Sequence, residues 1–198
     1  MAITDPSSIT PSQKKKLAEI VNDPVKWAQA FLITWNGDKK CNTPWTARWY
    51  QAEMLRDDSL KKVYRCGRRT GKTETMVIEA LYQTYKNPNY RVLIITPYIN
   101  QVDLAFKRIN ELVDASPAIK ARVVRQVKNP YQLEFSNHSS ILGFTTGASS
   151  GSGGASIRGQ RADLLILDEV DYMSEADFDS VMIIAGERPD IRTIMSST

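Results

Sequence analysis

One segment constrains the fold of this chain more than any other, because there an apolar run leads into a Gly-Lys-Thr turn and then into a helix-forming stretch. A bound phosphate chain needs backbone N–H groups that side chains do not cover, a fixed cation and a hydroxyl for Mg²⁺. The segment provides them in order as Gly67 and Gly71, then Lys72, then Thr73. The sequence therefore predicts a phosphate-binding loop between a strand and a helix.

The helix after the loop is predicted over about residues 72–85. Its N-terminal end carries a partial positive charge, which would point at the same phosphates. The usual phosphate-loop pattern begins with a glycine five residues before the second glycine, and here Cys66 occupies that position. Because a Gly-Lys-Thr turn is also an ordinary helix start, the interpretation needs a second motif.

The second motif is a run of four apolar residues that ends in Asp168 and Glu169. Such a run fits a central parallel strand that is buried on both faces. Its carboxyl end would lie beside the phosphate loop, because open α/β sheets bind their ligands at that edge. We expect Asp168 to hold Mg²⁺, mostly through water, and Glu169 to polarise the attacking water. The alternative is two solvated acids at a strand end.

Composition agrees with one globular α/β domain. The chain has 198 residues, 42% of them hydrophobic, and a net charge of +4, which is compatible with a polyanionic partner but does not require one. Cys41 and Cys66 form neither a metal pair nor a disulfide framework, and His138 alone cannot build a zinc site. No apolar run approaches the ~20 residues of a membrane span. We therefore expect no membrane partner and a reducing cytosol.

The N-terminal part is predicted to be a small helical appendage of residues 1–45, followed by a phosphate-loop domain of residues 46–198. Within the appendage a helix is expected over residues 24–34. Thr46 is then expected to cap a helix that runs to about residue 57.

Strands and helices alternate beyond the loop. An apolar strand is predicted over residues 91–96, and the helix after it has a repeating apolar face. The later elements are a hairpin over residues 132–135 and 140–144, a helix over 175–185 and a strand over 191–198. This alternation implies right-handed crossovers and a mostly parallel sheet.

A Gly- and Ser-rich stretch precedes the acidic strand and ends with Arg158 and Arg161. Such stretches are usually connectors. Arginine, however, binds phosphate in a bidentate manner, and this position could reach a phosphate on the same subunit or on a neighbouring one. We favour a functional role for Arg158 and leave both readings open for Arg161.

In this order the motifs resemble the ATPase domain of the large terminase subunit of tailed bacteriophages, the motor that packages DNA into proheads. The resemblance covers residues from about 46 to 198. The loop Gly67-Arg68-Arg69-Thr70-Gly71-Lys72-Thr73 is similar to the family's arginine-containing Walker A loop, which tolerates the missing first glycine. Asp168-Glu169 corresponds to the Walker B acids, and Ser196-Ser197-Thr198 to the coupling motif.

The resemblance implies roles for further residues. Tyr50 and Gln51 correspond to the family's adenine-binding motif, and Arg158 to an arginine proposed to act on a neighbour's ATP. The implied sites are Lys72, Arg68, Arg158 and Glu169 for catalysis, Tyr50, Gln51 and residues 67–73 for ATP, and Thr73 and Asp168 for Mg²⁺.

The resemblance also implies a P-loop NTPase fold of the RecA-like, ASCE type. The activity would be ATP hydrolysis, with Mg²⁺, that drives double-stranded DNA into a prohead. The implied partners are a homo-oligomeric ring of the chain itself, the prohead portal and the small terminase subunit, in the host cell cytoplasm. The family's nuclease domain and the C-terminal part of its ATPase domain are not in this sequence, so we expect a fragment of a longer protein.

Three alternatives share part of this pattern. A superfamily 2 helicase or another nucleic-acid translocase has the same loop and acidic strand, but needs a second RecA-like domain. A nuclease would use Asp168, Glu169 and Asp171 as metal ligands, yet no Glu-x-Lys follows Pro189-Asp190. A non-catalytic DNA-binding module would rely on the basic charge balance and the glycine-rich loop.

Overall fold

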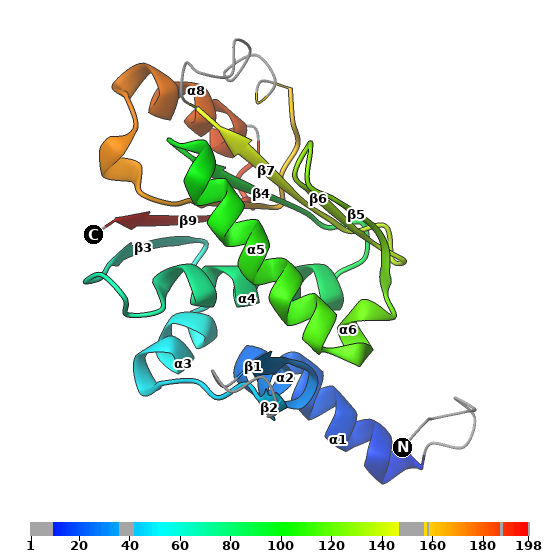
Figure 1. Cartoon of the computed structure of the whole chain (residues 1–198). Helices are drawn as coiled ribbons and strands as arrows, with labels where there is room; N and C mark the ends of the chain where they lie inside the picture. The colour runs from blue at the N-terminus through cyan, green and yellow to red at the C-terminus, as the bar shows by residue number, and fades with distance from the viewer. Residues whose placement is uncertain (1–9, 36–41, 147–156, 158, 187, 198) are drawn as a thin grey trace.

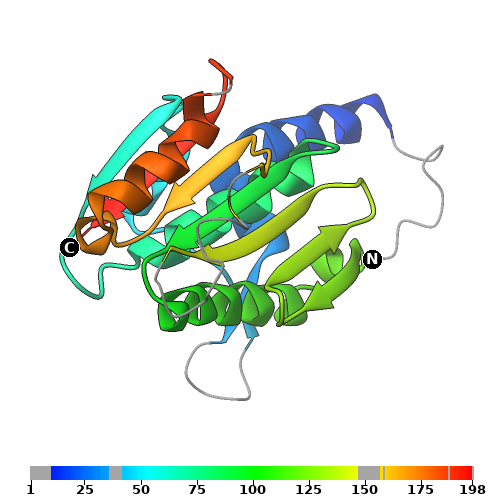
Figure 2. The ribbon, with the colours of Figure 1, turned by 90° about the horizontal axis from the view of Figure 1, so that it is seen from above.

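The computed structural model describes residues 10–35, 42–146, 157, 159–186 and 188–197. Its centre is a seven-stranded sheet with helices on both faces (Figures 1 and 2). In spatial order the strands are β3 (Lys61–Arg65), β9 (Arg192–Ser197), β8 (Leu164–Leu167), β4 (Arg91–Thr96), β7 (Ser140–Thr145), β6 (Gln132–Phe135) and β5 (Val123–Val127). The strands from β3 to β7 pair in parallel, and β6 and β5 continue the sheet antiparallel. The predicted mostly parallel sheet is confirmed, as is the β6–β7 hairpin, whereas β5 was not among the predicted strands.

Two separate hydrophobic cores explain why apolar and polar residues do not alternate along the central strands. In β4, Val92 and Ile94 join the core beneath α4 (Lys72–Lys86) and α5 (Ile99–Ala115), whereas Leu93 and Ile95 join the core beneath α8 (Glu175–Gly186). Every residue of β8 is buried as well. A strand covered by helices on both faces has no polar side, so its sequence is a continuous apolar run. The short helices are α6 (Pro117–Lys120) and η3 (Val170–Tyr172).

The N-terminal elements differ from two predictions. After α1 (Pro11–Asn22), α2 spans Pro24–Phe31 instead of 24–34, because β1 (Ile33–Trp35) pairs antiparallel with β2 (Asn42–Pro44). The next helix, α3 (Trp49–Arg56), begins three residues after Thr46, so Thr46 is not its cap. Instead, the Gln51 side chain satisfies the first turn, because its Oε1 accepts the backbone N–H of Arg48 at 3.1 Å.

The helix α2 packs into the same core as the phosphate-loop helix. Its Val25, Trp27 and Ala28 are buried in the cluster that also holds residues of α4. The division of the chain at residue 45 stays a prediction. Among the described residues, none of the helices combines the length and the apolarity that crossing a lipid bilayer requires.

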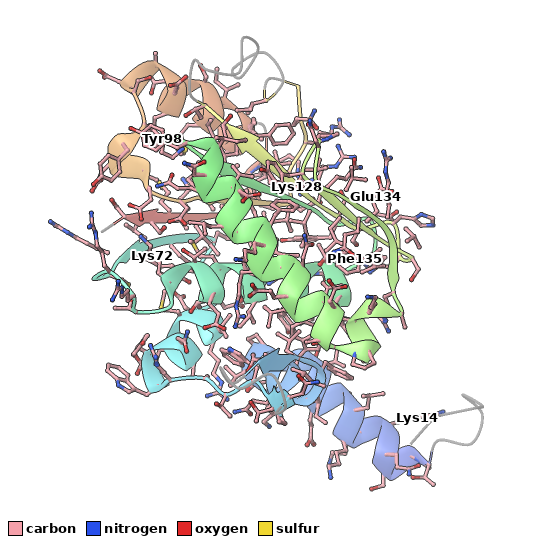
Figure 3. The ribbon with its side chains drawn as sticks, in the orientation of Figure 1. Lys14, Lys72, Tyr98, Lys128, Glu134 and Phe135 are labelled. Carbon is pink, nitrogen blue, oxygen red and sulfur yellow. The ribbon has the colours of Figure 1, made fainter. Side chains whose placement is uncertain are left out.

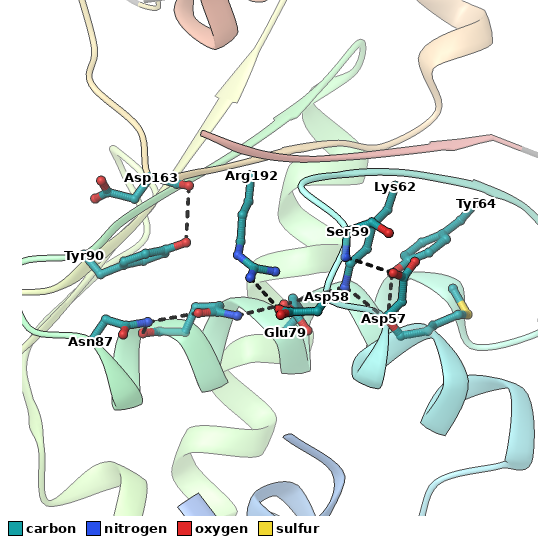
Figure 4. Close-up of polar contacts among 12 residues, drawn as sticks. Asp57, Asp58, Ser59, Lys62, Tyr64, Glu79, Asn87, Tyr90, Asp163 and Arg192 are labelled. Carbon is teal, nitrogen blue, oxygen red and sulfur yellow. Dashed lines mark hydrogen bonds and ion pairs between the residues drawn. The ribbon is translucent and has the colours of Figure 1, made fainter. Parts of the chain in front are cut away.

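Charged and amide side chains form a network at the amino ends of the parallel strands (Figure 4). Lys62 of β3 and Glu79 of α4 are both buried, with 4.0 Å between Nζ and Oε1. Gln83 donates to the same Oε1 at 3.0 Å, and Arg192 pairs with Asp58 at 2.6 Å. Burial raises the pKa of Glu79, and Lys62 and Gln83 offset this only in part.

We expect Glu79→Gln to flatten the dependence of stability on pH. A raised pKa means that, above the ordinary value of 4.5, the folded chain holds this proton more firmly than the unfolded chain does. The free energy of unfolding therefore falls as pH rises from there through the folded pKa. Urea unfolding at about pH 5 and about pH 8 measures this change. The free energy of unfolding should fall less between the two pH values for Glu79→Gln than for the wild type, and Glu53→Gln, at an exposed position, is the control. An equal fall in all three proteins would contradict the prediction.

Candidate active site

The carboxyl edge of the sheet brings the two predicted motifs together. β3 leads into the glycine-containing loop and α4. Its neighbour β9 ends at the serines, and β8, the next strand of the sheet, ends just before Asp168. β4 leads into Tyr98 and α5. In Figure 3, Lys72 and Tyr98 lie at this end of the molecule, far from Glu134 and Phe135. Residues separated by more than 90 positions in sequence thus become neighbours.

The loop conformation depends on Gly71. This residue has a φ of +85° and is the N-cap of α4. A Cβ at this position would lie 2.8 Å from Nε2 of Gln51, so the end of that side chain would have to shift. The left-handed backbone is one that glycine adopts without strain. Gly71 therefore lets the chain turn sharply, so that α4 starts at Lys72 with its N-terminus at the sheet edge.

Lys72 lies between the two predicted acids. Its Nζ is 3.2 Å from Oε1 of Glu169 and 3.6 Å from Oδ1 of Asp168. The side chain is only 7% exposed, so these contacts are shielded from water. The Lys72 ammonium is therefore paired with two carboxylates. A bound phosphate would compete with these carboxylates for the same ammonium.

Asp168 is held by hydroxyls on both sides. Thr73 Oγ1 donates to its Oδ2 at 3.2 Å, and the buried Ser196 donates to its Oδ1. The backbone N–H of Glu169, a residue with a left-handed φ of 57°, also donates to Oδ1 at 3.0 Å. A carboxylate beside a hydroxyl is the hard oxygen set that Mg²⁺ uses when phosphates and waters complete its shell. The donors therefore fit Mg²⁺, and in the described part of the chain no group of three His, Cys, Asp or Glu side chains offers an all-protein metal site.

A cavity of about 520 Å³ opens in front of the loop. Its walls are residues 67–74, Tyr98, Gln101, Glu169 and Tyr172. Arg68 and Arg69 are exposed at its rim. Tyr98, Gln101 and Tyr172 were not predicted as site residues, although the position of Tyr98 just after a parallel strand is a signal that could have found it.

Tyr50 and Gln51 lie against the loop but do not line that cavity. The Tyr50 hydroxyl donates to the carbonyl of Thr70 at 2.7 Å, and Gln51 Nε2 donates to the carbonyl of Gly71 at 3.4 Å. Arg48, which no motif predicted, donates to the Tyr50 hydroxyl at 2.8 Å. The adenine-binding role of Tyr50 and Gln51 stays a prediction.

The structure describes one of the two predicted arginines of the Gly- and Ser-rich stretch. Arg158 lies outside the described residues. Arg161 is described and exposed. An additional ion pair near the loop joins Glu74, in the first turn of α4, to Arg108 of α5.

A model of the DEAD/DEAH box helicase family matches residues 67–198, two thirds of the chain. Among curated proteins, none matches the sequence. The family match begins at the first loop glycine and includes both motifs of the carboxyl edge.

Three solved structures illustrate the likeness in fold. The large terminase ATPase domain of Thermus phage P74-26 is 20% identical with a TM-score of 0.64, over 78% of this chain and 65% of that one. The large terminase of bacteriophage HK97 is 15% identical with a TM-score of 0.74, over 90% of this chain and 37% of that one. The UvsW helicase from bacteriophage T4 is 14% identical with a TM-score of 0.56, over 98% of this chain and 63% of that one.

These likenesses establish the fold. The sheet and its flanking helices form a P-loop NTPase fold, and the predicted resemblance to large terminase ATPase domains is confirmed among solved structures. The chain spans less than two thirds of the length of each of these three structures. At 14–20% identity, activity and partners do not transfer with the fold.

Proposed function

Because the chain belongs to the DEAD/DEAH box helicase family, we propose that it is the ATPase part of an ATP-driven nucleic-acid motor. In its finer form the proposal is a large terminase ATPase domain, which hydrolyses ATP to move double-stranded viral DNA into a prohead. One observation carries the ATPase proposal. Four side chains lie within hydrogen-bonding or ion-pair distance of one another at the carboxyl edge of the sheet, those of Lys72, Thr73, Asp168 and Glu169.

The proposed chemistry follows from these contacts. The loop amides and the N-terminus of α4 would bind the β- and γ-phosphates, and the Lys72 ammonium would turn from its two carboxylates to the phosphate oxygens. Bound Mg²⁺ would neutralise developing charge on the phosphates, held by Thr73 and Asp168. Ser196 keeps the Asp168 carboxylate oriented. Glu169, once released from Lys72, would orient the water that attacks the γ-phosphate.

The remaining roles rest on the motif resemblance. Arg68 would act on the phosphates from the loop, and Arg158 would act on the ATP of a neighbouring subunit in a homo-oligomeric ring. The prohead portal, the small terminase subunit and double-stranded DNA would be the partners, in the host cell cytoplasm. The nuclease activity would belong to a separate C-terminal domain.

The second candidate is a superfamily 2 helicase-like translocase. The family match favours it, and so does the likeness of fold to the UvsW helicase from bacteriophage T4. The two candidates differ in what they do to nucleic acid, because a helicase separates the strands whereas a packaging motor moves an intact duplex.

The test measures ATP turnover and its response to nucleic acid. With Mg²⁺, the chain should hydrolyse ATP, and blunt double-stranded DNA should raise the rate without strand separation. Unwinding of a forked duplex would favour the helicase. DNA cleavage with Mg²⁺ and no ATP would indicate a nuclease, and DNA binding without any ATP binding would indicate a non-catalytic module.

A further inference from the structure

A second cavity, of about 560 Å³, lies at the amino ends of the parallel strands, at the opposite edge of the sheet from the phosphate loop. We propose that this cavity binds an organic cation of the guanidinium class, which donates an N–H group to the buried carboxyl group of Glu79. Part of the wall comes from residues 22–24 and 55–58, which precede the family match. The inference does not depend on the proposed function, because the residues of this wall and those of the cavity at the phosphate loop are different.

The first observation is a buried carboxyl oxygen that has no partner. Glu79 lines the cavity, yet its side chain is only 4% exposed. Among the described residues none hydrogen-bonds to its Oε2, whereas Oε1 accepts from Gln83. A buried polar oxygen without a partner costs free energy, whether the carboxyl group is ionised or protonated. A ligand that donates an N–H group to Oε2 would remove this cost.

A chain of amides along α4 holds this carboxyl group in place (Figure 4). Asn87 Nδ2 donates to Oε1 of Gln83 at 2.9 Å, and Gln83 Nε2 donates to Oε1 of Glu79 at 3.0 Å. The three residues are four positions apart, so they follow one another on one face of the helix. Lys62 donates to the carbonyl of Met54 at 3.2 Å, and its Nζ is 4.0 Å from Oε1 of Glu79, too far for a hydrogen bond. Oε2 is therefore an oriented acceptor.

The charges of the wall favour a cation. The three arginines of the wall all pair with carboxylates of the same wall, so an anion would have to break these pairs. The carboxylates exceed the basic side chains and are those of Asp23, Asp57, Asp58, Glu79, Asp163 and Asp190. The side chains of Asp58 and Asp190 are 92% and 69% exposed, against 4% for Glu79. Acidic groups therefore extend from the surface to the buried oxygen, and they attract a cation.

A guanidinium group suits this wall in shape as well as in charge. The Arg188 guanidinium already binds there, because its Nε and one terminal nitrogen donate to the two oxygens of Asp190 at 3.0 and 2.9 Å. Its other terminal nitrogen donates to Asp163 at 2.9 Å. The rings of Tyr82 and Tyr90 also line the cavity, and aromatic faces attract cations. The volume lies in the range of cavities that hold small organic ligands.

The test follows binding to the isotopically labelled chain by NMR at low ionic strength. Butylguanidinium chloride is the probe, butylurea is its uncharged isostere, and tetramethylammonium is a cation without N–H donors. We expect butylguanidinium to bind at least about 10-fold more tightly than either, because only its N–H groups make a charge-assisted hydrogen bond. The shifted signals should come from residues of this wall.

Two variants and a matched control assign the binding to Glu79. Glu79→Gln should weaken butylguanidinium binding at least about 10-fold, because the charged acceptor is lost. Asp58→Asn, at the exposed entrance, should weaken it about 2- to 5-fold and leaves the buried network intact. Glu53→Gln removes the same charge from an exposed position outside the cavity, and should leave binding within about 2-fold.

The pH dependence of binding is a second readout. Burial raises the pKa of Glu79, Lys62, Gln83 and Arg192 act to lower it, and Asp58 raises it further. A proton on the carboxyl group competes with the cation, so affinity should rise with pH. Between about pH 5 and about pH 8 the rise should be at least about 3-fold in the wild type and less than about 1.5-fold in Glu79→Gln. Three phenols also interact with Glu79 and stay neutral in this range because their pKa values are raised, those of Tyr64, Tyr82 and Tyr90.

A peptide distinguishes two sources of the guanidinium group. Tighter binding of acetyl-Gly-Arg-Gly-amide than of butylguanidinium would identify the side chain of a partner protein, and the reverse order would identify a small molecule; both results support the site. The inference is overturned if neither ligand binds, since an internal water then satisfies Oε2. Equal binding of butylguanidinium and tetramethylammonium, or equal losses in Glu79→Gln and Glu53→Gln, would also contradict it, because the attraction would then be diffuse.

Discussion

Replacing Lys72 with alanine is expected to raise the dissociation constant for Mg-ATP at least ~100-fold and to stop hydrolysis. The lysine is the buried cation at the start of α4, and it faces two carboxylates at 3.2 and 3.6 Å. Without it, a phosphate loses a charge-assisted hydrogen bond of about 1.5–3 kcal/mol and also meets the uncompensated charges of Asp168 and Glu169. Together these losses exceed the roughly 2.7 kcal/mol that correspond to 100-fold. Calorimetric titration of both proteins measures the difference.

The control for this variant is Lys86→Ala at the opposite end of the same helix. Lys86 donates to the Tyr82 hydroxyl at 3.2 Å and lies outside the cavity in front of the loop. Its loss removes the same charge from the chain, so general electrostatic attraction of ATP changes equally. Retention of Mg-ATP binding within about 3-fold in a folded Lys72→Ala protein would contradict the assignment of the phosphate loop.

The central strands and the loop were predictable because their signals are local. The run Leu164–Leu167 has no polar residue to face solvent, so burial on both faces and a parallel sheet follow from it alone. The Gly71 position needs a positive φ, which the loop pattern already requires. The meeting of Lys72 with Asp168 and Glu169 then followed from the rule that parallel strands end at one edge.

Other features depend on pairings that are distant in sequence. The helix predicted over residues 24–34 is shorter in the structure, because residues 33–35 form β1 and hydrogen-bond to β2. Neither of these three-residue strands can be recognised from its own sequence. The start of α3 is set by the Gln51 side chain, which also contacts Gly71, twenty positions away. A helix start that is coupled to a distant loop cannot be read from cap residues such as Thr46.

Replacing Trp27 with alanine is expected to lower the free energy of unfolding by about 3–5 kcal/mol. Trp27 is fully buried, and its ring lies 5.5 Å from Tyr82 and 5.3 Å from Tyr85, centroid to centroid. Both tyrosines belong to α4, the helix that Lys72 begins. The loss should lower the melting temperature by roughly 6–20 °C. Thermal and urea unfolding would measure it.

The matched control is Trp49→Ala, which removes the same side chain from an exposed position and should change stability by less than about 0.5 kcal/mol. If Trp27→Ala behaved like this control, residues 1–45 would be a separate appendage, as the sequence predicts. If it is as costly as expected, α2 is part of the core on which α4 rests, and the position of Lys72 depends on it. Removal of residues 1–45 would then expose to water the aromatic face that Tyr82 and Tyr85 form on α4.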